Sequence, residues 1–177
     1  MGKVFRNVKD YGARGDGVSD DTAAIQRAIS EGNRCGGPPD SEKCLSVTTR
    51  PALVYFPAGT YRVSRTIKAY YNTQLVGNPK DRPTIKAAAS FVDGLGVIST
   101  DEYIPGADGA QWYINQSNFL RQLRNFIIDM REAGMENIAG LHYQVAQATS
   151  LERVDFLMKE GAGSKQHGIC KYTPANH

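Results

Sequence analysis

The sequence predicts an all-β protein of one domain with a single short helix near its N-terminus. Short runs of β-branched and aromatic residues, interrupted by glycine and proline, fill most of the 177-residue chain. Only residues 22–32 have the apolar spacing of an amphipathic helix. A sequence pattern also recurs at a fixed distance in the second half. Many short strands of this kind are typical of a solenoid, a sandwich or a barrel.

Composition narrows the class of protein. The hydrophobic share of 41% and the charged share of 22% are ordinary for a soluble globular chain. Lysines and arginines are scattered, and the net charge is only +3, so nothing argues for nucleic-acid binding. No run approaches the roughly 18 apolar residues that a membrane-spanning helix needs. The first residues, MGKVFRNVKDYG, lack the apolar core of a signal peptide, so we expect either a cytosolic protein or an N-terminus that is not native.

The stretch YGARGDGVSDDTAAIQRAIS predicts a turn followed by a helix. The G-D-G triplet at 15–17 indicates a tight turn with positive φ. Asp20 and Asp21 then precede the apolar helix face and are expected to cap the helix, which should end near Gly32. The RGD triplet is too short to argue for adhesion, and the acidic spacing does not fit a calcium loop. The predicted buried face consists of Ala24, Ile25, Ala28 and Ile29.

Cys35 and Cys44 flank a loop rich in glycine and proline, CGGPPDSEKC. This spacing suits a disulfide that closes a small loop in an oxidising compartment. The alternative is a pair of free thiols. Cys170 is left over, and the chain offers no spacing of cysteine and histidine that favours a zinc site.

The strand-like runs follow the cysteine loop in order: LVYF, GTY, RVSRTI, TQLVG, PTIKAAA, GVIST, QWYIN, RNFIIDM, GLHYQVAQ and RVDFLM. Two of them share the pattern L-x-x-φ-x-φ-x-M, where φ is apolar. The copies occupy 123–130 and 151–158, and equivalent positions are 28 residues apart. This distance lies in the range of solenoid repeats, whose inward residues stack from coil to coil. Coincidence between two buried strands is the alternative.

The segments VKDYGARGDGVSDDTAAIQRAI and VYFPAGTYRVSRTI resemble the N-terminal signature of pectate-lyase-like domains. The resemblance implies a right-handed parallel β-helix, here a partial solenoid, with an N-terminal capping helix. Longer blocks, such as YIPGADGAQWYINQSNFLRQLRNFIIDM, resemble fungal glucan 1,3-β-glucosidases of glycoside hydrolase family 55. That resemblance covers about residues 4–168 and implies a secreted exo-acting enzyme with two tandem β-helix domains.

The resemblance also implies that this chain is a fragment. The family pattern ends near Ile169, so we expect an incomplete β-helix domain over 1–169 and a divergent tail over 170–177. In the resembled family the general acid is a glutamate of the second domain, which is missing here. We therefore expect the chain to be inactive alone, with β-1,3-glucan as the parent's substrate and no metal or other cofactor.

The segment HYQVAQATS carries the candidate site residues. By resemblance, Gln147 positions the attacking water. Gln144, His142 and Tyr143 are candidates for binding substrate, since amides can donate to a sugar hydroxyl and accept from water. Residues an odd number apart in a strand face opposite sides, so only one of the two glutamines should point into a cleft. The alternatives are an amide ladder, a surface position or core packing.

Four further residues are weaker candidates for functional roles. Trp112 could face a sugar, although a lone tryptophan is more often buried. Asp129 and Asp155 could form an acid–base pair or a calcium site, but their offset of 26 rather than 28 argues against stacking. Asn115 begins a glycosylation sequon. Two other functions stay open: another lyase or hydrolase of the β-helix superfamily, or a non-catalytic carbohydrate-binding module.

Overall fold

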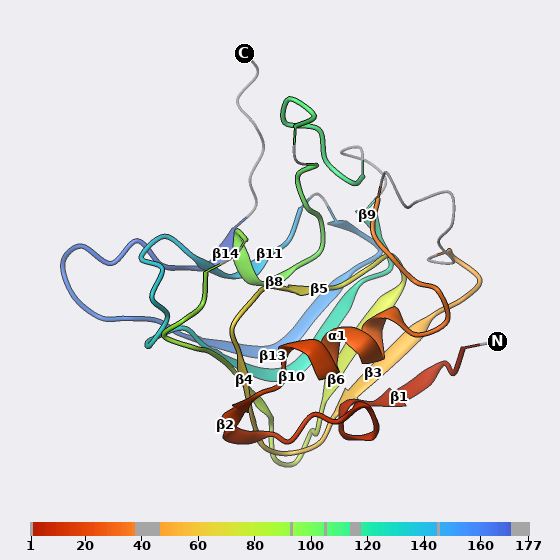
Figure 1. The fold of residues 1–177 in the computed structure, drawn as a ribbon, viewed down its shortest axis with the longest axis horizontal. Helices are drawn as coiled ribbons and strands as arrows, with labels where there is room; N and C mark the ends of the chain where they lie inside the picture. Colours follow the sequence, from red (N-terminus) through yellow and green to blue (C-terminus); the bar gives the residue numbers. More distant parts are fainter. Residues whose placement is uncertain are drawn as a thin grey trace.

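The computed structural model describes residues 2–37, 47–92, 94–104, 106–113, 118–144 and 146–170. In these ranges parallel strands wind in successive coils around one apolar core, and a single α-helix lies across one side of them (Figure 1). The chain is a partial right-handed parallel β-helix with a capping helix, as predicted.

Three sheets form the walls of the coils. The first contains, in spatial order, β1 (Phe5–Asn7), β3 (Ala52–Phe56), β6 (Thr73–Gly77), β10 (Gln122–Asp129), β7 (Thr84–Ala87), β4 (Thr60–Val63) and β2 (Asp16–Asp20), with β13 (Ser150–Leu157) beside β10. The second contains β14 (His167–Cys170), β11 (Ala139–His142), β8 (Gly96–Ser99) and β5 (Ile67–Lys68). The third pairs β12 (Ala146–Gln147) with β9 (Asn118–Phe119). A 3-10 turn, η1 (Val8–Tyr11), follows β1.

Alternation along the strands builds the core. Buried and half-buried residues alternate through β3 and β6, because successive side chains of a strand point to opposite faces. The Phe56 ring lies at the centre of this core. Its centroid is 5.0 Å from that of Phe126 and 5.4 Å from that of Tyr61, both in edge-to-face contact. Residues from three different strands therefore meet inside the coils.

The 28-residue repeat is one coil of the solenoid. β10 and β13 are parallel neighbours, and Leu123, Phe126 and Ile128 lie directly opposite the equivalent residues of the second copy, Leu151, Val154 and Phe156. The prediction from the repeat is confirmed. The corners of the coil repeat as well: Leu120 and Ala148 have φ of 60° and 50°, and Asn125 and Arg153 have φ of 61° and 51°. Non-glycine residues rarely adopt this left-handed conformation. Because it recurs at the equivalent positions one coil later, we infer that the bend of the coil requires it.

The helix α1 (Thr22–Ser30) buries the predicted apolar face, and the turn before it has positive φ at Gly15 and Gly17. The capping prediction needs a correction for Asp21. It occupies the N-cap position, but its carboxylate accepts hydrogen bonds from the main-chain N–H groups of Arg14 (2.7 Å) and Gly15 (2.9 Å) instead of from the helix. Asp20 accepts the N–H of Thr22 at 3.0 Å. The Asp21 carboxylate therefore stabilises the turn, although the sequence pattern predicts that it caps the helix.

Candidate functional site

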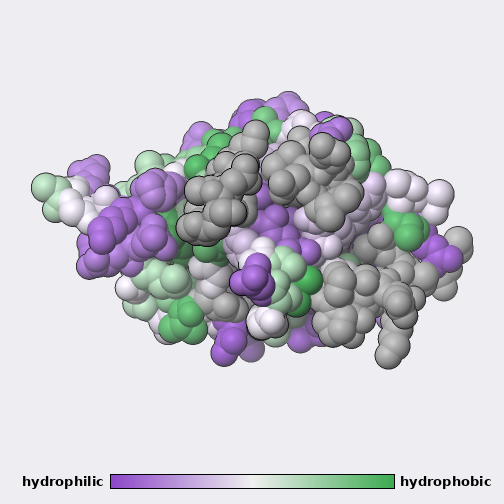
Figure 2. All heavy atoms as spheres, turned by 90° about the horizontal axis from the view of Figure 1, so that it is seen from above, coloured by the Kyte–Doolittle hydropathy of each residue, from purple (hydrophilic) through white to green (hydrophobic). Residues whose placement is uncertain are grey.

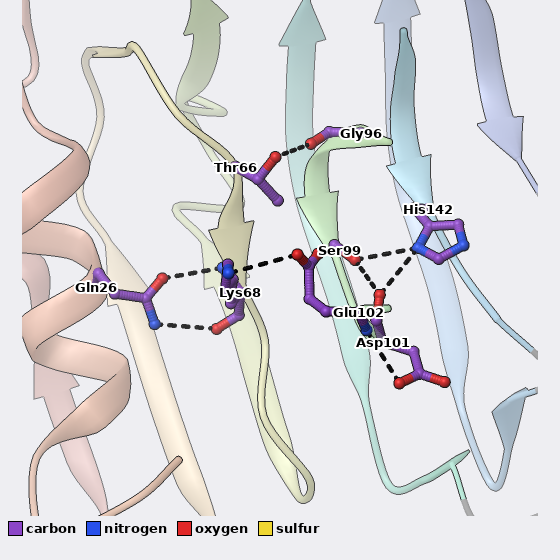
Figure 3. A network of polar contacts seen from close by, with 8 residues as sticks. All are labelled: Gln26, Thr66, Lys68, Gly96, Ser99, Asp101, Glu102 and His142. Carbon is purple, nitrogen blue, oxygen red and sulfur yellow. Dashed lines mark hydrogen bonds and ion pairs between the residues drawn. The ribbon is translucent and has the colours of Figure 1, made fainter. Parts of the chain in front are cut away.

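A polar network crosses the second sheet from the cap helix to β11 (Figure 3). Gln26 of α1 holds the main chain of Lys68 in β5 through hydrogen bonds of 2.9 and 3.2 Å. Lys68 Nζ lies 3.4 Å from Glu102 Oε2, and the Glu102 N–H donates to Asp101 Oδ1 at 3.0 Å. The network links the helix to the residues that follow β8.

His142 ends β11 and is fully buried. Its Nδ1 lies 3.0 Å from Ser99 Oγ and 3.1 Å from the Asp101 carbonyl oxygen, while Ser99 Oγ donates to that same oxygen at 2.6 Å. A carbonyl oxygen only accepts, so Nδ1 carries the proton and Nε2 is an acceptor in the neutral ring. Burial lowers the pKa of His142, and the Asp101 carbonyl opposes that shift. The buried His142 ring contacts Ser99 and the main chain of Asp101. Its contact with a substrate stays a prediction.

Residues 102–104 and 110–112, which follow β8, pair as a short antiparallel hairpin. The Trp112 N–H donates to Glu102 O at 2.9 Å, and the Ile104 N–H donates to Ala110 O at 2.7 Å. Of the strand-like run QWYIN, the structure describes the first three residues, and among these only Gln111 forms a β-bridge, an antiparallel one with Tyr103. The hairpin rises from the end of β8 at the top of Figure 1.

Asp101 closes the base of this hairpin. Its Oδ1 accepts the N–H groups of Glu102 and Tyr113, the latter at 3.3 Å, and the residue is only 1% exposed. Burial raises the pKa of Asp101 to about 6, against the lowering effect of those hydrogen bonds and of the nearby Arg121 guanidinium. The sequence patterns gave no reason to select this carboxyl.

The two candidate glutamines differ in exposure. Gln144 is 1% exposed, and its Nε2 donates to Gln111 Oε1 in the hairpin at 3.3 Å. Gln147 is exposed at the end of β12, directly beside Phe119 of β9 in the parallel ladder. The main-chain oxygen of Gln147 accepts the N–H of Leu120 at 3.2 Å. Of the two amides, Gln147 is therefore the one that a ligand in solution can reach.

Tyr143 is half-buried, and its hydroxyl donates to the main-chain oxygen of Arg121 at 2.9 Å. Arg121 itself was not selected by the sequence analysis. Its side chain is buried, its Nε donates to Ala69 O at 2.9 Å, and its guanidinium lies 4.8 Å from the Tyr113 ring centroid and 5.6 Å from that of Tyr71. Burial raises the pKa of Tyr143 and lowers that of Arg121. No local pattern distinguishes this arginine from an exposed one.

Trp112 is packed inside the hairpin region and is not an open platform. Its ring lies 5.9 Å from that of Tyr70, and Lys68 Nζ lies 5.4 Å from its centroid. Gly36 and Gly37 also pack against it, since a Cβ at either position would lie within 2.5 Å of Trp112 atoms. Trp112 is half-buried, so it is neither the open platform nor the fully buried tryptophan of the two alternatives.

Asp129 and Asp155 do not form a pair. In the β10–β13 ladder Asp129 lies opposite Leu157, so the carboxyls do not stack, as their offset predicts. Each carboxylate instead accepts from an arginine, Arg131 at 2.8 Å and Arg82 at 2.5 Å. Within the described ranges, no group of three or more His, Cys, Asp or Glu residues is placed to hold a metal ion.

Three predictions involve residues outside the described ranges. Cys44 is one of these residues, so the Cys35–Cys44 disulfide stays a prediction, as do the glycosylation at Asn115 and the divergent tail beyond Cys170. Cys170 itself carries a free thiol. In the part of the chain that is described, no helix combines the length and apolar character needed to cross a membrane.

A cleft of about 370 Å³ lies elsewhere, between the loops at 133–136 and 159–166. These loops project at the left of Figure 1, and the left end of Figure 2 shows hydrophilic atoms mixed with white and green ones. Gln166 bridges them, since it accepts the Lys159 N–H at 2.7 Å and donates to Met130 O at 2.9 Å. The cleft contains none of the predicted site residues and no aromatic side chain.

Comparison with known proteins identifies relatives over nearly the whole chain. A non-secreted LysM effector of Penicillium expansum is 57% identical over 94% of this chain. A probable glucan endo-1,3-beta-glucosidase of Arthroderma benhamiae is 54% identical, and a glucan 1,3-beta-glucosidase of Cochliobolus carbonum is 44% identical, again over 94% of this chain. The chain spans 13%, 18% and 21% of the length of these three relatives, respectively.

Solved structures agree with the fold. A protein of Geobacillus virus E2, ORF18, superposes with a TM-score of 0.56 and 29% identity, covering 86% of this chain and 25% of the other. The A-module of the Azotobacter vinelandii mannuronan C-5 epimerase AlgE4 gives a TM-score of 0.55 at 23% identity, covering 86% of this chain and 38% of the other. The family model described as rhamnogalacturonase A/epimerase, pectate lyase-like, matches residues 5–177, and the chain belongs to this family.

Proposed function

We propose that this chain is part of a glycoside hydrolase acting on β-1,3-glucan, and that it supplies a wall of the substrate site rather than the complete catalytic machinery. The observation that carries the proposal is the identity, over 94% of this chain, to a probable glucan endo-1,3-beta-glucosidase (54%) and to a glucan 1,3-beta-glucosidase (44%). The exposed amide of Gln147 gives that wall a group able to contact both water and a sugar hydroxyl.

The chemistry near Gln147 supports a partial role. Glycoside hydrolysis requires a general acid and a second group that attacks or activates water. An amide can orient water but cannot act as a base of useful strength. Among the described carboxyls that show a shift, only Asp101 has a raised pKa, and it is buried with its Oδ1 bonded to the hairpin. We place the general acid in a second β-helix domain, as the resemblance implies, and we expect that the chain alone does not hydrolyse glucan.

The test is binding by the purified chain. We expect it to bind laminari-oligosaccharides, and Gln147→Ala to weaken binding about five- to tenfold, because one neutral hydrogen bond contributes about 1 kcal/mol. Gln122→Ala is the matched control: Gln122 is a partly exposed glutamine on β10, and this variant should bind like the wild type. Equal affinity of Gln147→Ala and the wild type would remove Gln147 from the site.

The similarity in fold to the AlgE4 A-module favours a second candidate, an enzyme that acts on an acidic polysaccharide. Such a substrate needs exposed cations, whereas Arg121, which follows Leu120 and its hydrogen bond to Gln147, is buried against two tyrosine rings. Preferential binding of alginate or pectate over laminarin would favour this candidate. Glucan binding that persists without hydrolysis after a second domain is supplied would instead favour a non-catalytic binding module.

We propose an extracellular location for the parent protein. The predicted Cys35–Cys44 disulfide and the sequon at Asn115 both fit an export route. The relative named as a non-secreted LysM effector is the finding that argues the other way. Mass spectrometry of the protein from its own organism distinguishes the two, because export predicts an oxidised cysteine pair.

A further inference from the structure

A row of aromatic rings leads along the surface toward Gln147. The ring centroids of Tyr113 and Tyr71 are 6.1 Å apart, and those of Tyr71 and Phe119 are 6.3 Å apart. All three rings are only partly buried, in contrast to the fully buried rings of the core. Tyr71 lies 42 residues before Tyr113 and 48 before Phe119 in the sequence, so the fold brings its ring to the other two. We call Tyr113, Tyr71 and Phe119 the aromatic row.

The aromatic row ends at the candidate amide. Phe119 and Gln147 are register partners in the β9–β12 ladder. Neighbouring parallel strands lie about 4.8 Å apart, so Gln147 is one strand away from the last ring. A second contact fixes this spacing, because the Leu120 N–H donates to the main-chain oxygen of Gln147 at 3.2 Å. The aromatic row and the exposed amide therefore form one continuous surface.

The Arg121 guanidinium packs against two rings of the aromatic row. It lies 4.8 Å from the Tyr113 centroid and 5.6 Å from the Tyr71 centroid, while its Nε donates to Ala69 O. Cation–π contacts of this kind are strongest when the cation is removed from water. Asp101 fixes the other end by accepting the Tyr113 N–H at 3.3 Å. The rings are thus held in place before a ligand arrives, which lowers the entropic cost of binding.

The charges near the aromatic row favour a neutral ligand. The buried ionisable groups beside it, Arg34, Arg121 and Asp101, are at most 4% exposed and engaged in the protein. A partly exposed row of rings with a neutral amide at its end suits the apolar face and the hydroxyl groups of a pyranose. We propose that Tyr113, Tyr71 and Phe119 bind consecutive glucose units of a neutral β-glucan whose terminal unit lies at Gln147. This inference rests on the proposed function and adds a binding surface to it.

The experiment titrates laminarihexaose into the purified chain by calorimetry. We expect Tyr71→Ala and Phe119→Ala each to weaken binding about tenfold, because each removes most of a contacting ring. Tyr71→Phe keeps the ring and should bind within about twofold of the wild type. Tyr55→Ala is the matched control: this tyrosine is also partly exposed and stacked, on Phe5 at 5.9 Å, but it lies on β3. It should bind like the wild type.

A second readout does not depend on variants that fold poorly. The ring proton resonances of Tyr71, Tyr113 and Phe119 in the wild type should shift as laminarihexaose is added, while those of Tyr55 stay fixed. Wild-type binding with unchanged affinity in Tyr71→Ala and Phe119→Ala, or with unshifted rings, would overturn the aromatic row and leave the proposed function standing. Binding of alginate or pectate but of no neutral glucan would contradict both.

Discussion

The strands β10 and β13 occupy the same place in consecutive coils, yet their side chains are buried to very different degrees. Leu123, Phe126 and Met130 of the earlier copy are at most 3% exposed. In β13 no residue is fully buried, and Met158, which follows it at the position equivalent to Met130, is 40% exposed. The two copies share one apolar pattern. The apolar pattern determines which side chains point inward. The neighbouring coils determine how far those side chains are shielded from solvent.

The largest expected effect concerns the two equivalent apolar positions in the middle of these strands. Phe126→Ala should lower the free energy of unfolding by about 3–5 kcal/mol, since it empties the centre of the core. Val154→Ala, at the equivalent position of β13, should cost about 1 kcal/mol or less because Val154 is only half-buried. Urea unfolding followed by circular dichroism measures both. If Val154→Ala lowered the free energy of unfolding as much as a fully buried valine would, the later coil would be shielded from water as completely as the earlier one.

Asp101, which follows β8, and Asp155, in β13, should respond to pH in opposite directions. Burial raises the pKa of Asp101 to about 6, so its stabilising contribution is complete below about pH 4 and is lost as the pH rises through 6. A shift of this size corresponds to about 3 kcal/mol at most. Asp155, which is exposed in β13, has its pKa lowered by Arg82, so any contribution it makes is lost as the pH falls.

The measurement compares the unfolding free energy of the wild type, Asp101→Asn and Asp155→Asn between pH 4 and pH 7. Asp101→Asn should remove the decline in stability that the wild type shows above pH 4. Asp155→Asn should leave that decline unchanged. A wild-type profile that rises with pH across this window, and still rises in Asp101→Asn, would contradict the assignment of the buried carboxyl.

The smallest expected effect concerns the coil corners. Ala148 has φ of 50°, a conformation that costs a non-glycine residue about 1 kcal/mol, so Ala148→Gly should stabilise the chain by about 0.5 kcal/mol after the entropy of glycine is counted. Leu120→Gly relieves the same strain one coil earlier but loses a half-buried leucine, so it should destabilise. Thermal unfolding of the two variants tests the difference. A lower melting temperature for Ala148→Gly would show that the corner is not strained.

Sequence reasoning found what local pattern encodes. The repeat at Leu123 and Leu151 marks a coil, because stacked inward positions need the same kind of side chain in each turn. It failed where a residue's role depends on distant partners. The main-chain oxygen of Ala69, which accepts a hydrogen bond from Arg121 Nε, is 52 residues away in the sequence. Asp21 accepts hydrogen bonds from the preceding turn rather than from the helix that follows it. The aromatic row could not be predicted for the same reason, since Tyr71 lies 42 residues before Tyr113 in the sequence.

The most direct test of the account is to incubate the purified chain with laminarihexaose and follow both partners by NMR. The account predicts shifts of the aromatic-row resonances together with an oligosaccharide that remains intact, because the wall binds glucan but lacks the general acid. Release of glucose by the chain alone, above a heat-inactivated control, would contradict the claim that the catalytic acid lies elsewhere. An absence of any shift at millimolar oligosaccharide would contradict the claim that this wall binds β-1,3-glucan.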